Sequence, residues 1–357
     1  MDVYSKLRDK LNRHPVGVPE LPEILEILRI LFSAPEAEFA LVLGITPKPI
    51  EEIAAKANMK LDSAVSLGES LANKGLVLSY VKNDTRYYGL LPIMPGVFEY
   101  PFMKRKLLDL DFTKLARLWH DYYDKGFGQE YHGGKTSMSR VIAIKKSIDS
   151  KSSVLPFDDV SYYIEKANSI AVGDCSCRAA EKKCDNPIRT CLAFDSGANF
   201  LVERRISDFI TKREAFQILE VTEKAGLVHM TSNTANKLAF ICNCCTCCCV
   251  TLGYLTRLKN PGSHPTSNFV AQADVELCNS CGACVERCPA KAVRIAGSIH
   301  IDANLCIGCG LCASACQVEA VKLMRRPDSA DPPADARALA LRVAEEKGRL
   351  DAFLANL

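Results

Sequence analysis

Eight cysteines toward the C-terminus fall into two runs with the same spacing. Both runs have the form C-x2-C-x2-C-x3-C, and they comprise Cys278, Cys281, Cys284 and Cys288 in the first and Cys306, Cys309, Cys312 and Cys316 in the second. At this spacing three thiolates can bind one [4Fe–4S] cluster while the fourth reaches a second cluster. Only 17 residues separate the two runs. The pattern therefore predicts two [4Fe–4S] clusters and a role in electron transfer.

Residues 270–325, which contain both runs, resemble the bacterial two-cluster ferredoxins. The resemblance implies crossed ligation, in which one cluster is bound by Cys278, Cys281, Cys284 and Cys316 and the other by Cys306, Cys309, Cys312 and Cys288. Gln317 stands where these ferredoxins usually have a proline. That proline shapes a turn and is not a ligand, so the departure does not affect the predicted cluster. A pair of zinc sites is the alternative, but zinc sites use pairs of close cysteines.

Ten further cysteines lie between residues 175 and 249, in two groups. The candidate ligands among them are Cys175, Cys177, Cys184, Cys191, Cys242, Cys244, Cys245 and Cys247. Cys248 and Cys249 complete the ten and are not among the candidates. Ten thiols exceed the four that one cubane needs, so we expect one or two further iron–sulfur clusters. A structural zinc site and a redox-active dithiol are the alternatives.

Two arrangements of these middle cysteines stay open. The first group could form one site alone, because Cys175 to Cys191 has the spacing C-x-C-x6-C-x6-C. Alternatively, Cys175 and Cys177 could meet Cys242, Cys244 or Cys245 at neighbouring strand ends. Arg178 could donate hydrogen bonds to cluster sulfur or lie on the surface. His229 could be a ligand, although a hydrogen-bonded core histidine is the more common case.

The distribution of the cysteines indicates metal ligation in a reducing compartment. All 18 lie between residues 175 and 316, whereas a disulfide scaffold is short and spreads its cysteines more evenly. The N-terminus has no apolar signal-peptide core, and no apolar run approaches the roughly 18 residues of a membrane span. We expect a soluble, cytoplasmic protein, and several oxygen-sensitive clusters in one chain suggest an anaerobic host. The net charge of +3 indicates no particular partner.

The middle cysteines follow predicted strands. Apolar runs at 169–173 and 238–241 predict buried strands that lead directly into Cys175 and Cys242. Strands that end in cysteines would place those cysteines at one edge of a sheet, on a rigid base for a cofactor. Helices are predicted at 157–167 and 212–224, and a further strand at 227–230.

The N-terminal region resembles the winged-helix transcription regulators. Four short helices precede a hairpin around Asn83 and Asp84, and Gly75 is placed to end the last helix, 61–74. That helix contains Asp62, Glu69 and Lys74, so its charges sum to −2 + 1 = −1. A DNA reader needs basic residues there. We therefore expect this module to dock a protein and not DNA.

Together these patterns predict an α+β multidomain protein. The expected segments are a winged-helix-like domain at 1–100, a helical connector at 101–156, a cysteine-rich α/β cluster domain at 157–265, a two-[4Fe–4S] ferredoxin domain at 266–327, and a linker with a C-terminal helix at 328–357. The ferredoxin segment should contain a hairpin near 292–301 and a returning strand at 320–324.

As a whole, the chain resembles the multidomain 4Fe–4S ferredoxin-type proteins of anaerobes, in which a ferredoxin unit follows a region of CSCR and CNCC type. The resemblance implies an electron-transfer subunit that works with a larger partner oxidoreductase. No residue is a convincing substrate acid, base or nucleophile. Two other functions stay open: a redox-sensing winged-helix regulator, and a reductase with catalysis at a middle cluster.

Overall fold

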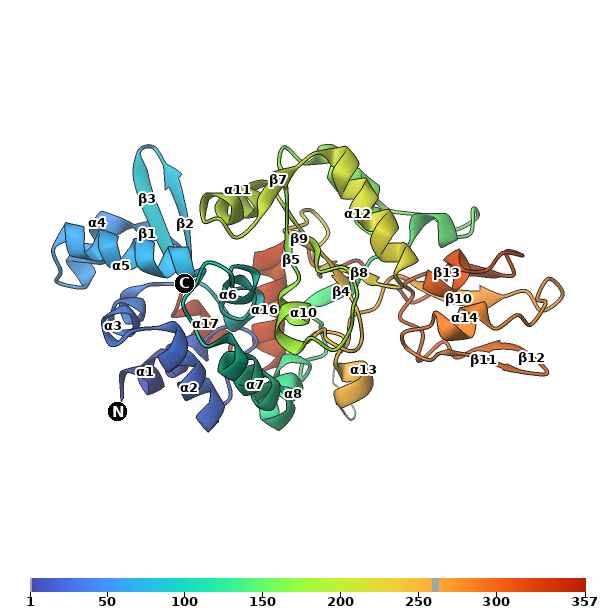
Figure 1. Cartoon of the computed structure of the whole chain (residues 1–357), viewed down its shortest axis with the longest axis horizontal. Coiled ribbons are helices and arrows are strands. Elements are labelled where there is room, and N and C mark those ends of the chain that lie inside the picture. Colours follow the sequence, from blue (N-terminus) through green and yellow to red (C-terminus); the bar gives the residue numbers. More distant parts are fainter. Residues whose placement is uncertain (1, 259–262) are drawn as a thin grey trace.

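The computed structural model describes residues 2–258 and 263–357 as an elongated molecule, with the N-terminal helices at one end and the ferredoxin segment at the other (Figure 1). None of the helices in the described ranges is both long and apolar enough to cross a membrane.

The N-terminal domain consists of helices followed by a hairpin. Its helices are α1 (Val3–Leu11), α2 (Pro22–Leu31), α3 (Ala34–Val42), α4 (Ile50–Lys56) and α5 (Leu61–Lys74), and its strands are β1 (Lys48–Pro49), β2 (Val77–Lys82) and β3 (Thr85–Leu90). The α5 helix and the hairpin lie where the sequence predicts them. Gly75 ends α5 in the left-handed conformation, with φ of 75°, which glycine adopts without strain. The α1 helix was not predicted, and the winged-helix assignment stays a prediction.

The segment between residues 101 and 156 is more than a connector. Its first part contains α7 (Phe112–Tyr122) and α8 (Gly128–Tyr131), which follow α6 (Glu99–Met103), and its buried aromatic residues pack into the core of the N-terminal domain. Its later part contributes the strand β4 (Ser139–Val141) to the sheet of the middle domain. The segment therefore joins two cores. A three-residue strand is too short to stand out as an apolar run in the sequence.

The middle domain is built on a six-stranded sheet with strand order β4-β8-β9-β6-β5-β7, and all its neighbouring strands are antiparallel. The remaining strands are β5 (Ile170–Asp174), β6 (Arg189–Phe194), β7 (Asp208–Ile210), β8 (Val228–Ser232) and β9 (Phe240–Cys244). Around the sheet lie α9 (Val160–Lys166), α10 (Ser176–Glu181), α11 (Asp195–Glu203), α12 (Lys212–Lys224) and α13 (Tyr254–Arg257).

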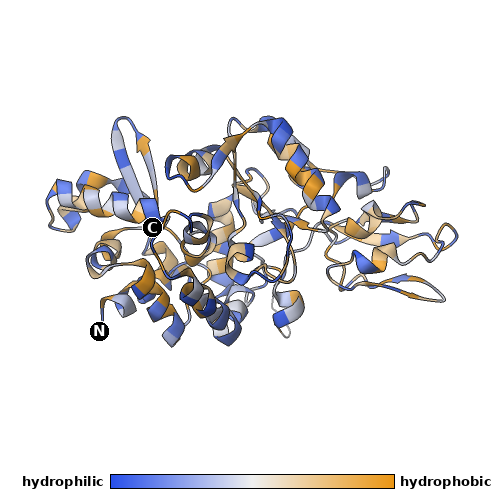
Figure 2. Cartoon of the chain, viewed as in Figure 1, coloured by the Kyte–Doolittle hydropathy of each residue, from blue (hydrophilic) through white to orange (hydrophobic). Residues whose placement is uncertain are grey.

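The α12 helix shows why the sheet has one well-packed face. It begins at a capping box formed by Thr211 and Glu214, and it presents Ala215, Ile218 and Leu219 to the core that contains strand residues of β5, β6 and β9. Figure 2 shows apolar and polar residues interleaved along this helix, as expected for a helix with one buried side.

The ferredoxin segment has two short antiparallel pairs. One joins β10 (Phe269–Ala273) to β13 (Val321–Arg325), and the other joins β11 (Val293–Ala296) to β12 (Ser298–Ile301). The helices α14 (Ala283–Glu286) and α15 (Leu311–Ser314) begin next to Gly282 and Gly310, which both have positive φ. At Gly308 a Cβ atom would lie 2.1 Å from the carbonyl oxygen of Phe269, so only glycine fits this approach.

The C-terminal region returns to the N-terminal domain. In place of the single predicted helix there are two, α16 (Ala336–Glu346) and α17 (Leu350–Leu354), because the chain turns at Gly348 with φ of 64°. The backbone N–H of Ile45 donates to the carbonyl oxygen of Asn356, and Arg349 donates to Asn12. These contacts close the chain on itself and leave the ferredoxin segment at the far end (Figure 1).

Candidate metal centres

The eight ferredoxin cysteines surround two separate cavities. One cavity is lined by Cys288 together with Cys306, Cys309 and Cys312. The other is lined by Cys316 together with Cys278, Cys281 and Cys284. Each set of four is one of the crossed sets that the ferredoxin resemblance implies. The fourth cysteine of each run thus lies with the first three of the other run.

The two cavities differ in their exposure to solvent. Cys306, Cys309 and Cys312 are all buried, and burial raises the pKa of Cys309 to about 12. In the other set Cys281 is exposed, and Cys284 alone is buried. The cavity around Cys309 is therefore the inner one, and the cavity around Cys281 faces outward.

Backbone N–H groups point at the sulfur atoms in both sets. Ala271 N–H donates to Cys306 Sγ at 3.4 Å, Ala292 N–H to Cys288 Sγ at 3.2 Å, and Ser280 N–H to Cys278 Sγ at 3.4 Å. Such donors stabilise the negative charge that thiolates carry when they bind iron. Four soft thiolate ligands with N–H donors around one cavity fit a [4Fe–4S] cluster.

Six of the middle cysteines form a closed ring of neighbouring thiols, which we call the six-thiol ring. In order around the ring they are Cys175, Cys177, Cys249, Cys244, Cys242 and Cys191. Each thiol lies close enough to the two beside it for them to shift its pKa. None of the six is exposed, and Cys175, Cys244 and Cys249 are buried.

The sheet explains how these six thiols meet. The strands β5 and β9 each pair antiparallel with β6, so they run in the same direction and end at the same edge. Cys175 follows β5, Cys191 lies in β6 opposite Gly173, and Cys242 and Cys244 lie at the end of β9. Cys177 is in the first turn of α10, and Cys249 follows in the turn after β9. The predicted meeting of cysteines at one sheet edge is observed, although β9 extends through Cys242 and does not end before it.

The pKa values of the thiols around the ring are alternately lowered and raised. Donation from Cys177 and Cys191 lowers the pKa of Cys175 well below its usual range, and donation from Cys191 and Cys244 lowers that of Cys242 to about 6. The donors show the opposite shift, because losing their proton breaks the bond. Thiols that shift one another's pKa in this way lie close together, as the ligands of one common centre must.

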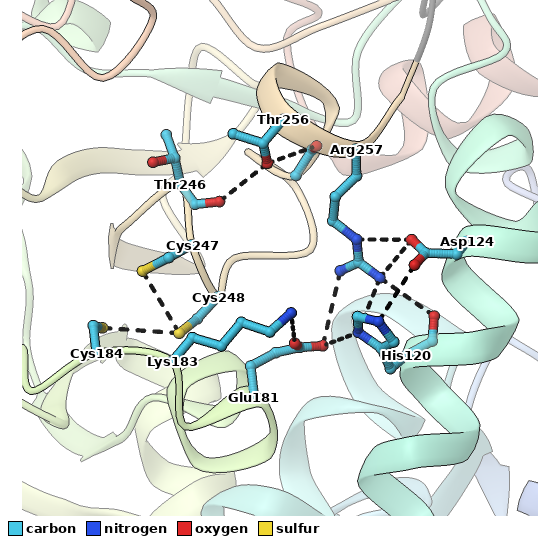
Figure 3. A network of polar contacts seen from close by, with 11 residues as sticks. His120, Asp124, Glu181, Lys183, Cys184, Thr246, Cys247, Cys248, Thr256 and Arg257 are labelled. Atoms are coloured by element: carbon cyan, nitrogen blue, oxygen red, sulfur yellow. Dashed lines mark hydrogen bonds and ion pairs between the residues drawn. The ribbon is translucent and has the colours of Figure 1, made fainter.

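The other four middle cysteines form a second and tighter group, the Cys184 quartet, which consists of Cys184, Cys245, Cys247 and Cys248. Their four Sγ atoms all lie within 4.8 Å of one another. The Sγ atom of Cys184 is 3.8 Å from Cys245 Sγ and 3.8 Å from Cys248 Sγ, which is itself 3.8 Å from Cys247 Sγ. The quartet joins the loop between α10 and β6 to the turn after β9, and Figure 3 shows three of its members, Cys184, Cys247 and Cys248.

The structure therefore groups the middle cysteines differently from the first arrangement that the spacing left open. Cys184 lies with Cys245, Cys247 and Cys248, whereas Cys175, Cys177 and Cys191 belong to the six-thiol ring. Lys182, which ends α10 in the left-handed conformation with φ of 50°, lies between the two sets. The second arrangement, in which Cys175 and Cys177 meet Cys242 and Cys244, is close to the observed ring. Cys248 and Cys249, absent from the candidate ligands, belong to the quartet and the ring.

Arg178 lies buried between the two groups of middle cysteines and not on the surface. Its Nη1 donates to the carbonyl oxygen of Asn243 at 2.8 Å, and its Nη2 donates to Thr190 Oγ1 at 2.5 Å. Despite its burial, the negative charge of Cys175, Cys191 and Cys245 raises its pKa. Its Nε–H is buried and has no protein partner. A buried cation with a free donor beside thiolates fits a role in stabilising a bound cluster.

His229 is a hydrogen-bonded core residue, the more common case. Its Nδ1 lies 2.6 Å from Oδ1 of Asn243, which is its cross-strand partner in β9. Because side chains alternate along a strand, this pair lies on the face opposite to Cys242 and Cys244. His229 is therefore not placed to bind a metal with them.

A charged network that sequence reasoning missed holds the end of α10 beside the quartet (Figure 3). Glu181 accepts from Lys183 Nζ at 2.6 Å and lies 3.0 Å from His120 Nδ1. Arg257 pairs with Asp124 at 2.6 Å. The network ties α7, α10 and α13 together, so it fixes the start of the loop that carries Cys184. Its members are far apart in sequence, which leaves no local signal.

The middle and ferredoxin cysteines share one apolar core. Cys244 and Cys249 of the six-thiol ring pack in the same cluster of buried residues as Cys309, Ile307 and Leu311 of the ferredoxin segment. Residues after β4 form the bridge, since the N–H of Ile144 donates to the carbonyl oxygen of Cys309 at 3.0 Å. The inner ferredoxin cavity and the six-thiol ring are thus linked through one apolar core.

Comparison with known proteins identifies one part of the chain. Residues 271–294 and 299–322 match the family described as the 4Fe-4S binding domain, and these stretches contain all eight cysteines of the two runs. No curated protein and no solved structure matches the chain. The ferredoxin domain, together with the clustered middle cysteines, supports an iron–sulfur electron-transfer role.

Proposed function

We propose that this chain relays electrons between a partner oxidoreductase and a further iron–sulfur cluster in the six-thiol ring, through two [4Fe–4S] clusters of its ferredoxin domain. The observation that carries the proposal is the apolar core shared by Cys309 with Cys244 and Cys249. A protein that only stored clusters would gain nothing from this proximity.

The protein's part in this function is to hold the clusters and control their surroundings. Each cubane supplies a one-electron couple when it is bound. The thiols of each crossed set provide four ligands, and the N–H donors of Ala271, Ala292 and Ser280 offset the negative charge. Burial of Cys306, Cys309 and Cys312 keeps water from the inner site, whereas the outer site faces solvent.

The outer site is where a partner would dock. Apolar side chains around the first run are exposed, including Val275 and Leu277 at 54% and 55%. Exposed apolar residues beside a redox centre suit a transient protein contact. Electrons would then pass from the outer to the inner site and on to the ring, or the reverse.

Ion pairs of the N-terminal hairpin and of α5 argue against the alternative function of a DNA-binding, redox-sensing regulator. Arg86, a basic residue of the hairpin, pairs with Glu203 at 2.5 Å, and Glu69 of α5 pairs with Arg204 at 2.6 Å. Arg86 is thus engaged inside the molecule and is not free for phosphate. Exposed apolar residues on α5 and the hairpin, such as Val65 and Val81, favour a protein partner here as well.

The reductase alternative needs an iron with an open coordination position. The ring offers six thiols, which is more than the four irons of one cubane require. An excess of ligands disfavours an open position. Electron transfer is therefore the function that these residues support best.

Electron delivery to the ring tests the relay. A reduced bacterial ferredoxin, too large to reach the buried ring, should reduce the middle cluster quickly in the reconstituted wild-type chain. In Cys309→Ser, which removes a ligand of the inner site, that reduction should fall to the rate of a chain without ferredoxin clusters. Freeze-quenched electron paramagnetic resonance would follow it. Dithionite, a small reductant, should reduce the middle cluster in both proteins. Equal rates with the protein donor would rule out the relay.

A further inference from the structure

The spacing of the four sulfur atoms in the Cys184 quartet suits a single metal ion. At a Zn–S distance of about 2.3 Å, tetrahedral geometry places neighbouring sulfurs about 3.8 Å apart. The quartet shows three Sγ–Sγ distances of 3.8 Å, and all its pairs lie within 4.8 Å.

The ferredoxin thiols provide an internal comparison. A cubane holds its thiolates on four separate irons, so their sulfurs lie farther apart than the ligands of one ion. Within residues 2–258 and 263–357, the quartet is the only group of three or more metal-binding side chains with donor atoms all within 4.8 Å. In neither ferredoxin set do three thiols come this close together. The four sulfur atoms of the quartet are therefore too close together to bind a [4Fe–4S] cubane.

We propose that Cys184, Cys245, Cys247 and Cys248 bind one zinc ion in a tetrahedral site, separate from the iron–sulfur cluster of the six-thiol ring. The sequence pattern agrees, because Cys245-Thr-Cys247-Cys248 brings three thiols to one turn. Closed four-cysteine sites are the usual form of structural zinc. Binding displaces the protons of the four thiols to solvent.

Neighbouring groups stabilise the charge of this site. Four thiolates and one Zn²⁺ sum to −4 + 2 = −2. Asn186 Nδ2 donates to Cys184 Sγ at 3.3 Å, and the buried guanidinium of Arg178 lies near Cys245, whose negative charge helps to raise its pKa. Donors of this kind orient the ligands and increase metal affinity.

The position of the quartet indicates what the zinc does. It joins the loop that precedes Cys191 to the turn that precedes Cys249, and both of those residues belong to the six-thiol ring. Zinc has no redox chemistry, so it would not carry electrons. It would clamp two segments that close the ring, and so hold the ring's geometry while the cluster changes its charge.

Metal analysis of the full-length, anaerobically purified chain tests the site. The wild type should contain about one zinc per chain. Cys247→Ala should lose that zinc and keep its iron, because Cys247 is the exposed member and its loss opens no core cavity. Thr246→Ala, the neighbouring change in the same turn, should keep both metals. Cobalt added in place of zinc should give the absorption of a tetrahedral thiolate site in wild type and Thr246→Ala only.

Two results would overturn the proposal. One is a wild type without zinc, or with a mononuclear iron in its place. The other is a Cys247→Ala chain that loses about four irons, since that would mean a cubane occupies the quartet. Failure of the ring to hold a cluster would leave the zinc count unchanged, so the two proposals fail separately.

Discussion

Replacing Cys288 and Cys309 together should remove about four iron atoms per chain, whereas replacing Cys288 and Cys281 together should remove about eight. The reason is the crossed arrangement: Cys288 and Cys309 line the same cavity, while Cys281 lines the other. The first double serine variant would lose one cluster, and the second would lose both.

This pair of variants separates crossed from uncrossed ligation, which single changes cannot do. If each run held its own cluster, Cys288 and Cys281 would share a site and the two results would be exchanged. Iron and sulfide analysis after anaerobic reconstitution measures the outcome. The single variants Cys288→Ser, Cys309→Ser and Cys281→Ser serve as controls, and each should lose about four irons.

Replacing each of two adjacent cysteines, Cys248 and Cys249, should remove a different metal from the middle domain. Cys249→Ser should lower the iron content beyond the ferredoxin clusters by at least about four atoms, because Cys249 belongs to the six-thiol ring. Cys248→Ser should leave that iron in place and release zinc, because Cys248 belongs to the Cys184 quartet.

Both residues are buried, and both changes replace sulfur by oxygen, so general destabilisation should affect them alike. The difference between the two variants therefore reports the identity of the site. The same loss of iron from both would mean that the ring and the quartet hold one common centre. Zinc lost from Cys249→Ser and iron lost from Cys248→Ser would reverse our assignment.

The ferredoxin sites could be predicted from the sequence because most of the cysteines in each set lie close together along the chain. Three ligands of each set lie within seven residues, and only the fourth depends on the fold. The α5 and α12 helices were predicted with their observed bounds for a similar reason. A glycine ends α5, and a capping box begins α12. Each of these two helix ends is therefore determined by residues next to it in the sequence.

The division of the middle cysteines could not be predicted, because it depends on strand register. Cys191 lies in β6, whose residues Arg189–Phe194 begin with polar side chains and give a weak strand signal. Pairing of Leu192 with Ile241 brings Cys191 beside Cys242. Cys184 lies instead with Cys245, Cys247 and Cys248. From spacing alone, these cysteines are equivalent. The return of the C-terminal helices to the N-terminal domain is likewise set by contacts distant in sequence.

A coulometric reductive titration of the reconstituted full-length chain, followed by electron paramagnetic resonance, tests the central claim most directly. The account predicts uptake of about two electrons by the ferredoxin clusters and at least one more by the cluster of the six-thiol ring, each with the signal of a reduced cluster. Cys249→Ser should lose the additional uptake alone. A chain that binds iron yet takes up no electrons would contradict an electron-transfer function.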